Sequence, residues 1–231
     1  MTTSIQSAFP ARRGNAAPSL ENGDHLDQPT FHARYLAMPK SFRAELIGGV
    51  VYVPSPLKVP HGDIHGQVMM WLNIYRAHTP GTQALDNATD ILGPDSEPQP
   101  DGCLLIKGGQ THTESDYLVG PPEFAVEVAS SSEAFDLFEK RNDYERYGIT
   151  EYLVLVVREA RAVWFIRSAG ADDHFIEQPM PSDGIFRSKV FPGLWLDAAA
   201  LFRGEPMRVI DVLNMGLASQ EHAAFVGKQS R

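Results

Sequence analysis

Large apolar residues alternate with two alanines and one glutamate, Glu127, along residues 124–129 (FAVEVA). Successive side chains of a β-strand point to opposite faces, so this alternation predicts a strand that carries Glu127 between two small neighbours on one face. A carboxylate in a core-type strand is costly to bury without a partner, and small neighbours leave space above it. The pattern suits a metal ligand, and a glutamate on the wet face of an edge strand is an equal alternative.

A helix is predicted directly after this strand. Residues 130–133 (SSSE) have the form of a capping box, and Gly148 is placed to end the helix. Between them Asp136, Lys140 and Tyr144 recur every four residues, which places all three on one stripe of an α-helix. Taken alone, Lys140 is explained more simply as a solvated lysine in a mixed acidic and basic helix.

A second carboxylate precedes another apolar run. Asp101 follows Pro100 and stands just before residues 103–106, so it lies at the entrance of a predicted strand. From a neighbouring strand it could meet Glu127. Proline followed by aspartate is also a common turn, so this signal is weak by itself.

The remaining pattern completes a mixed α/β arrangement. The predicted elements are a helix from Thr30 to Leu36 capped by Thr30, a hairpin over 43–53 about Gly48-Gly49, an amphipathic helix over 61–78, strands over 82–92, 103–106, 151–157, 162–166 and 188–196, and a short helix to Phe202. They predict an α/β (α+β) fold with a central mixed β-sheet flanked by helices and an N-terminal β-hairpin. Residues 1–28 are expected to be a disordered tail, 29–203 one domain, and 204–231 a partly helical extension that packs on the domain or on a second copy.

Composition narrows the classes of partner. The chain has 231 residues, a net charge of −9 and one cysteine, Cys103. An acidic chain is not typical of proteins that attach to nucleic acid without specificity, so DNA binding would be weak or local. The absence of a disulfide framework, a hydrophobic signal region and a bilayer-length apolar stretch favours a cytoplasmic protein without membrane contact. Basic residues are concentrated at and after the candidate site: Lys140, Arg141, Arg146, Arg158, Arg161 and Arg167.

Several segments taken together resemble a known group of proteins. They are Glu45-Leu-Ile-Gly-Gly-Val-Val, His61 ahead of the amphipathic helix, Pro100-Asp101, Val126-Glu-Val-Ala-Ser130, Asp136, Lys140, Tyr144, Gly148-Ile-Thr-Glu-Tyr152 and Ser188-Lys-Val-Phe-Pro-Gly-Leu194. This set resembles the PD-(D/E)XK nuclease superfamily and, more closely, a bacterial family catalogued as putative restriction endonucleases. The resemblance covers residues 30–203.

Two positions depart from that pattern. Ala129 stands where the superfamily usually has its lysine, and the resemblance implies that Lys140 on the helix takes its place. Leu153 stands where the close family often has tryptophan, a difference that looks structural.

The resemblance implies a restriction endonuclease-like fold that hydrolyses DNA with Mg²⁺, or with Mn²⁺ as an alternative ion. Mg²⁺ prefers oxygen ligands and keeps several waters, so Asp101, Glu127 and the carbonyl of Val128 would suffice to hold it. Lys140 would orient and help deprotonate the attacking water and stabilise charge on the phosphate. The resemblance also places Glu45 near the site, as a second carboxylate for metal or water that could hold a second ion, whereas the residues alone favour an exposed strand glutamate. The resemblance further suggests a homodimer.

Three further residues are expected to support the site without touching the metal: His61, Asp136 and Tyr144. A tyrosine that only packs in the core and an aspartate in the capping turn are equal alternatives for the last two. Three alternatives remain open at this point. A zinc site could use His61 and His65, one turn apart, with Asp63 nearby, although a third ligand is not identified. A catalytically silent nuclease fold could bind nucleic acid or a protein partner, and an unrelated metal hydrolase of small molecules is the third.

Overall fold

A six-stranded mixed sheet forms the centre of the computed structural model, which describes residues 18–130, 132–168 and 173–229. Its strand order is β11-β10-β9-β8-β5-β3, in which β8 and β9 are parallel and every other pair is antiparallel. The strands are β3 (Thr82–Asp86), β5 (Gly102–Ile106), β8 (Phe124–Ala129), β9 (Glu151–Val156), β10 (Arg161–Arg167) and β11 (Phe175–Glu177). The predicted central mixed sheet is therefore confirmed.

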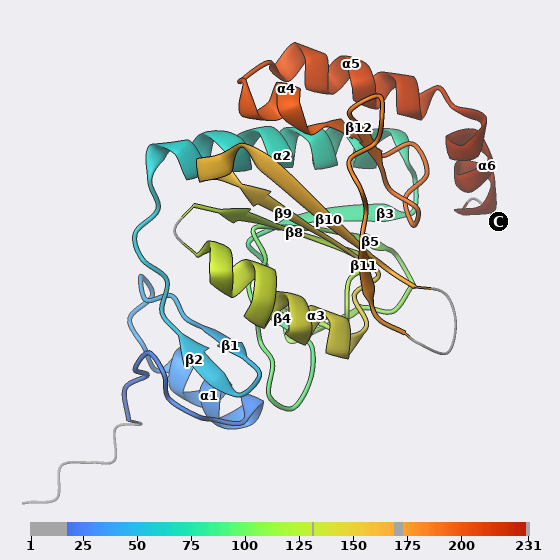
Figure 1. Cartoon of the computed structure of the whole chain (residues 1–231). Helices are drawn as coiled ribbons and strands as arrows, with labels where there is room; N and C mark the ends of the chain where they lie inside the picture. The colour runs from blue at the N-terminus through green and yellow to red at the C-terminus, as the bar shows by residue number, and fades with distance from the viewer. Residues whose placement is uncertain (1–17, 131, 169–172, 230–231) are drawn as a thin grey trace, which may run out of the picture.

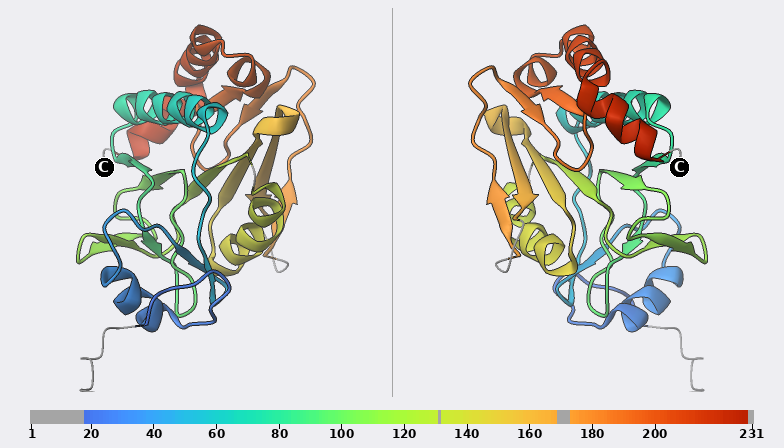
Figure 2. Two further views of the ribbon diagram at one scale, coloured as in Figure 1. Left: turned by 90° about the vertical axis from the view of Figure 1, so that its left-hand side faces the viewer. Right: turned by 90° about the vertical axis from the view of Figure 1, so that its right-hand side faces the viewer.

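Helices cover both faces of this sheet, as Figures 1 and 2 show. On one face lies α2 (Val59–His78), and behind it lie α4 (Ala198–Phe202) and α5 (Pro206–Leu217). On the other face lie the π-helical turn η1 (Phe135–Lys140) and its continuation α3 (Arg141–Tyr147). Every residue of β8 and β9 is buried, as expected for a parallel pair enclosed between two helical layers.

The predicted amphipathic helix is α2, which begins two residues earlier than expected. Its buried apolar residues follow helical spacing and include Trp71 and Tyr75, both fully inaccessible. The indole Nε1 of Trp71 donates to the carbonyl of Trp195 at 2.9 Å, and the Tyr75 hydroxyl donates to the carbonyl of Pro192 at 2.9 Å. These two bonds fasten the 188–197 region onto α2.

Three small sheets surround the centre. The first is the hairpin of β1 (Glu45–Ile47) and β2 (Val50–Tyr52), in which Ile47 pairs with Val50. Its loop residues Gly48 and Gly49 have φ of 57° and 79°, a conformation that favours glycine at both positions, so the predicted hairpin is confirmed. The other two sheets are β4 (Asp90–Ile91) with β7 (Tyr117–Val119) and β6 (His112–Glu114), and β12 (Ile185–Arg187) with β13 (Trp195–Asp197).

Three local predictions were wrong. The strand expected over 82–92 is divided between two sheets, because Asn87 adopts a left-handed conformation with φ of 47° and turns the chain. The strand expected over 188–196 is mostly a loop, since only its last two residues belong to β13 and none belongs to the central sheet. The first helix, α1 (Gln28–Leu36), is capped by Asp27, whose carboxylate accepts from Thr30 N, and not by Thr30 itself.

The folded part extends beyond the expected domain boundaries at both ends. Before α1, the backbone N–H of Gly23 donates to Val51 O and that of Leu26 donates to Gly49 O, each at 2.8 Å. These bonds attach residues 23–26 to the hairpin, within a segment expected to be a disordered tail; residues 1–17 of that tail lie outside the described residues. After residue 204, α5 buries Val209 and Leu213 in the main core, and α6 (Gln220–Gln229) follows it. The extension therefore packs on its own domain.

Within the part of the chain that the structure describes, no helix combines the length and apolarity needed to cross a bilayer.

Replacing Leu213 with alanine tests whether α5 is an integral part of the core. Leu213 is fully buried, so Leu213→Ala should lower the free energy of unfolding by about 2–5 kcal/mol through lost burial and a residual cavity. The matched control is Met215→Ala on the same helix, where the side chain is 53% exposed and the change should stay within about 0.5 kcal/mol. Urea unfolding followed by circular dichroism measures both. Equal effects of the two variants would show that α5 is peripheral.

Candidate active site

Two paired strands bring the predicted carboxylates to one level of the sheet. Asp101 directly precedes β5, Glu127 lies in β8, and Gly102 of β5 stands opposite Val126 of β8. The backbone N–H of Val128 donates to Asp101 Oδ2 at 2.7 Å. Asp101 is therefore held against the stretch of β8 that carries Glu127.

A histidine from the opposite helical layer holds the same carboxylate. His61, in the first turn of α2, places Nε2 at 3.2 Å from Asp101 Oδ2. His65, one turn later, directs its Nε2 to Asp101 O at 2.9 Å and to Asp86 Oδ1 at 3.1 Å. The two imidazoles thus contact different oxygens, and both serve to fix the start of β5.

Lys140 is the cation at the centre of the site. Its Nζ lies 2.9 Å from Glu127 Oε1 and 2.9 Å from Glu45 Oε1. The Tyr144 hydroxyl donates to the same oxygen of Glu127, also at 2.9 Å. The side chains of Lys140 and Glu127 are each 5% exposed and that of Glu45 is 12% exposed, so these contacts are shielded from water. One lysine therefore joins strand β8, the hairpin and the helix between them.

The helix that carries Lys140 differs from the predicted regular α-helix. Residues 135–140 form a π-helical turn, a rare irregularity that is frequent at functional sites. Lys140 and Tyr144 both reach Glu127, whereas the Asp136 carboxylate accepts from Ser132 Oγ at 2.5 Å. Lys140 and Tyr144 of the expected stripe therefore bind Glu127, whereas Asp136 binds Ser132.

The predicted capping box at residues 130–133 was wrong in the residues that bind one another. Glu133 forms an ion pair with Arg161 at 3.2 Å. At the start of the helix the backbone N–H of Asp136 donates to Ser132 O at 2.9 Å, and the Asp136 side chain binds the hydroxyl of the same serine. Ser132 thus begins the helix. Its spacing of four residues from Asp136 was a usable signal in the sequence.

Burial and mutual repulsion shape the ionisation of the carboxylates. Burial raises the pKa of Glu127 well above its ordinary value, the charge of Lys140 opposes this, and the negative charge of Asp101 adds to it. Burial also raises the pKa of Asp101, but the hydrogen bonds from His61 and Val128 outweigh this, and the net shift is downward. Burial raises the pKa of Asp136 to about 6. Of Asp101, Glu127 and Asp136, Asp101 is thus the one that stays ionised most readily.

Lys140 retains its proton in this setting. Burial lowers the pKa of the ammonium, but the charges of Glu127 and Glu45 outweigh burial and raise that pKa well above its ordinary value. The upward shifts of Lys140 and Glu127 are compatible because one lysine is shared among several carboxylates that repel one another. We therefore regard Lys140 as a fixed positive charge.

The potential metal-binding atoms around Lys140 are carboxylate oxygens, the ligand type that a hard divalent cation prefers. Four carboxylates, those of Glu45, Asp101, Glu127 and Asp136, act on one lysine, so the cluster carries an excess of negative charge when ionised. Among the described residues no three His, Cys, Asp or Glu side chains are arranged to hold a metal ion. An ion here would take two carboxylates, a backbone carbonyl and waters, which suits Mg²⁺ and does not suit the zinc alternative, since His61 and His65 bind other groups.

Gln99 contributes to the site and was not predicted from the sequence. The backbone N–H of Gln99 donates to Glu45 Oε1 at 2.7 Å, and its side-chain amide donates to Thr89 Oγ1 at 3.0 Å. Glu45 is therefore oriented by Gln99 on one side and by Lys140 on the other. The important contact uses the backbone, so the residue type at position 99 gave no signal of it.

The sheet order, the flanking helices and the cluster of two strand carboxylates with a lysine define a restriction endonuclease-like fold. The profile of the family described as "Putative restriction endonuclease" matches residues 30–199, and the chain belongs to this family. The resemblance stated from the sequence is thereby confirmed. No curated protein matches the chain.

A solved structure supports the same fold. It is the crystal structure of a putative nuclease belonging to DUF820 from Anabaena variabilis ATCC 29413, with a TM-score of 0.57 and 14% sequence identity. The match covers 75% of this chain and 97% of that chain. At this level of identity the likeness concerns the fold.

Asp136→Asn should remove part of the pH dependence of stability. The folded-state pKa of Asp136 is about 6, against 3.8 ordinarily, so the folded protein binds the extra proton between these values and loses stability as pH rises through them. The loss attributable to this group is about 2 kcal/mol from pH 4.5 to pH 7, because one pKa unit corresponds to about 1.4 kcal/mol and the protonation is already partial at pH 4.5. Urea unfolding at pH 4.5 and pH 7 in EDTA measures this loss. The free energy of unfolding should fall less between the two pH values in Asp136→Asn than in the wild type.

Ser132→Ala provides the matched comparison. Its hydroxyl lowers the pKa of Asp136 by hydrogen bonding, so its removal should increase the loss of stability with rising pH, opposite in direction to Asp136→Asn. The same pH dependence in all three proteins would show that Asp136 titrates normally.

Proposed function

We propose that this protein is a Mg²⁺-dependent endonuclease that hydrolyses phosphodiester bonds in DNA, with Mn²⁺ as an alternative ion. The family supports a nuclease-like function. The observation that carries the finer proposal is the excess of buried carboxylates around Lys140, which an oxygen-seeking cation would neutralise. The −9 net charge is consistent with binding that is local to such a metal site.

Each side chain has a defined task in this mechanism. Asp101, Glu127 and the carbonyl of Val128 would hold the metal, which supplies Lewis acidity toward the phosphate and a more acidic bound water. Lys140 is held at 2.9 Å from Glu127 and keeps its proton, so it stabilises negative charge on the phosphate and orients the water as a donor. The raised pKa of Lys140 disfavours the expected role in deprotonating the water.

The supporting residues position these groups. His61 fixes Asp101, and Tyr144 donates to the Glu127 oxygen that also contacts Lys140. Glu45 binds Lys140 and the backbone of Gln99, which supports a role in positioning the lysine more than the expected role in binding a second ion.

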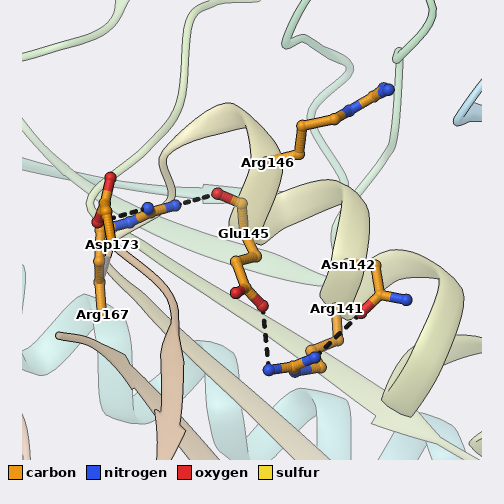
Figure 3. A pocket seen from close by; sticks show the side chains of 6 residues that line it. All are labelled: Arg141, Asn142, Glu145, Arg146, Arg167 and Asp173. Atoms are coloured by element: carbon orange, nitrogen blue, oxygen red, sulfur yellow. Dashed lines mark hydrogen bonds and ion pairs between the residues drawn. The ribbon is translucent and has the colours of Figure 1, made fainter. Parts of the chain in front are cut away.

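The arginines beyond Lys140 do not provide a free phosphate-binding surface. Arg141, Arg146 and Arg167 line a surface hollow of about 460 Å³, and Figure 3 shows two of them turned toward carboxylates. The ion pairs are Arg141–Glu145 at 3.0 Å, Arg146–Asp143 at 3.0 Å, Arg161–Glu133 at 3.2 Å and Arg167–Asp173 at 2.7 Å. The basic character noted in the sequence is thus largely neutralised within the fold.

One observation favours a second candidate function. Lys140 and Glu127 are each only 5% exposed, and both have hydrogen-bonded partners without any ligand. Such a cluster could serve only to specify the fold, as buried ion pairs sometimes do. The protein would then be a catalytically silent module that binds nucleic acid or a protein partner.

Divalent cations should stabilise the folded protein if the cluster binds them. A ligand at about 100 times its dissociation constant adds about 2.7 kcal/mol, which corresponds to a rise in Tm of roughly 5–10 °C for a chain of this size. Thermal unfolding in EDTA, Mg²⁺ and Mn²⁺ should show this rise in the wild type and not in Asp101→Asn. The exposed Asp116→Asn, on the turn between β6 and β7, should behave as the wild type. A rise that persists in Asp101→Asn would place the ion elsewhere.

Cleavage of DNA tests the proposed activity. Plasmid and single-stranded DNA should be cut in Mg²⁺ or Mn²⁺, with the rate reduced at least about 100-fold in Asp101→Ala and in Lys140→Ala, because each removes charge stabilisation at the reacting phosphate. Circular dichroism checks that both variants are folded, and Met215→Ala, remote from the site, is the positive control. Equal activity in wild type and variants would refute the assignment. Retained binding of nucleic acid without cleavage would favour the silent module.

A further inference from the structure

An exposed apolar segment connects the hairpin to α2. Residues 53–59 (VPSPLKV), which we call the 53–59 strap, are exposed along their whole length, with Leu57 67% and Val59 85% exposed. Two prolines restrict the backbone of this segment and remove two donors from it. Isolated surface leucines and valines are ordinary, but a run of them on a stiffened segment requires an explanation.

Both ends of the strap are anchored beside the candidate active site. Before it, the ring of Tyr52 packs on Phe135 with 4.1 Å between centroids, and Lys140 Nζ lies 5.6 Å from the Phe135 ring. After it, His61 lies 3.2 Å from Asp101. The strap therefore runs from the lysine side of the site to the metal-ligand side, along the edge where Figure 1 shows the chain rising from β2 to α2.

The reactive groups expose little of their surface to solvent. The side chain of Asp101 is 13% exposed, and those of Glu127 and Lys140 are 5% exposed. A phosphate must approach these nearly buried atoms closely, and a flexible single strand can bring one phosphate to them more readily than a stiff duplex, whose deformation costs energy.

The charge distribution also favours a single strand over a duplex. Duplex recognition depends on many phosphate contacts by lysine and arginine, and the arginines of α3 and β10 are already paired with carboxylates. On the strap Lys58 is the one cation, and it is exposed to solvent. Unpaired bases instead offer flat apolar faces, which stack on aromatic rings and pack on apolar side chains.

We propose that the substrate of this site is single-stranded DNA, whose unpaired bases lie on the 53–59 strap and the Tyr52–Phe135 pair while a phosphate enters beside Asp101 and Glu127. This inference rests on the proposed nuclease function. It adds the class of substrate and the surface that selects it.

The test compares matched oligonucleotides of one sequence as a single strand and as a blunt duplex. Cleavage is measured in Mg²⁺, and binding is measured by fluorescence anisotropy in Ca²⁺. The single strand should be cut and bound at least tenfold better than the duplex. The double variant Leu57→Ser/Val59→Ser, whose side chains are exposed and so should not disturb folding, should lose about tenfold in single-strand affinity.

Two further variants complete the design. Tyr52→Leu keeps apolar bulk against Phe135 but removes the ring, and should also weaken single-strand binding several-fold. The matched control is Ile176→Ser/Met180→Ser, an exposed apolar pair at and after β11, which should bind and cut as the wild type does.

The outcomes separate this inference from the proposed function. If the duplex is cut and bound as well as the single strand and the strap variants have no effect, the inference is overturned while the nuclease assignment stands. If neither substrate is cut but single-strand binding still requires the strap, the nuclease assignment fails and the strap surface is supported. Absence of both cleavage and binding overturns both.

Discussion

The buried contact between Lys140 and two glutamates is the interaction on which the site depends. Glu127 comes from the central sheet and Glu45 from the hairpin, so the lysine at 2.9 Å from each joins two parts of the chain that are distant in sequence. Removing one partner of such a cluster leaves an uncompensated buried charge, whereas the complete cluster costs far less. The helix, the hairpin and the central strand β8 are thus required to meet at this point.

The two faces of β8 differ in composition, and this difference directs Glu127 toward Lys140. Phe124, Val126 and Val128 belong to the core beneath α2, whereas Ala125 and Ala129 belong to the core beneath α3. Glu127 lies between Val126 and Val128 in sequence, so its side chain points to the opposite face of the strand, which it shares with the two alanines. A strand that is buried on both sides therefore presents its one carboxylate to the helix that supplies Lys140 and Tyr144.

Local chemistry made several features predictable from the sequence. The hairpin followed from two adjacent glycines, and the proximity of Asp101 and Glu127 followed from two apolar runs that form neighbouring strands. The features that could not be predicted from the sequence depend on tertiary contacts. Periodicity indicated a helix after residue 204 but not the surface on which it packs, and an α-helical stripe gave no indication of the π-helical turn.

The same limit applies within the site. Each of Asp101, Glu127 and Lys140 had an ordinary explanation when taken alone, and only their joint placement on two strands and the following helix indicated a site. Residue types did not identify contacts made through the backbone, such as Val128 N to Asp101 and Gln99 N to Glu45. Nor did they indicate that Lys140 would be shared by two glutamates, which raises its pKa and favours a fixed charge over a base.

The replacement of the usual strand lysine by Ala129 is explained by packing. Ala129 is 1% exposed and lies in the same buried cluster as Tyr144 and Tyr152. A lysine at this position would project into the space that these rings fill, whereas a methyl group lets the helix approach the strand closely. That approach brings the Tyr144 hydroxyl within 2.9 Å of Glu127, and Lys140, one turn earlier, reaches the same oxygen. The small side chain on the strand thus leaves room for the helix that carries Lys140 and Tyr144.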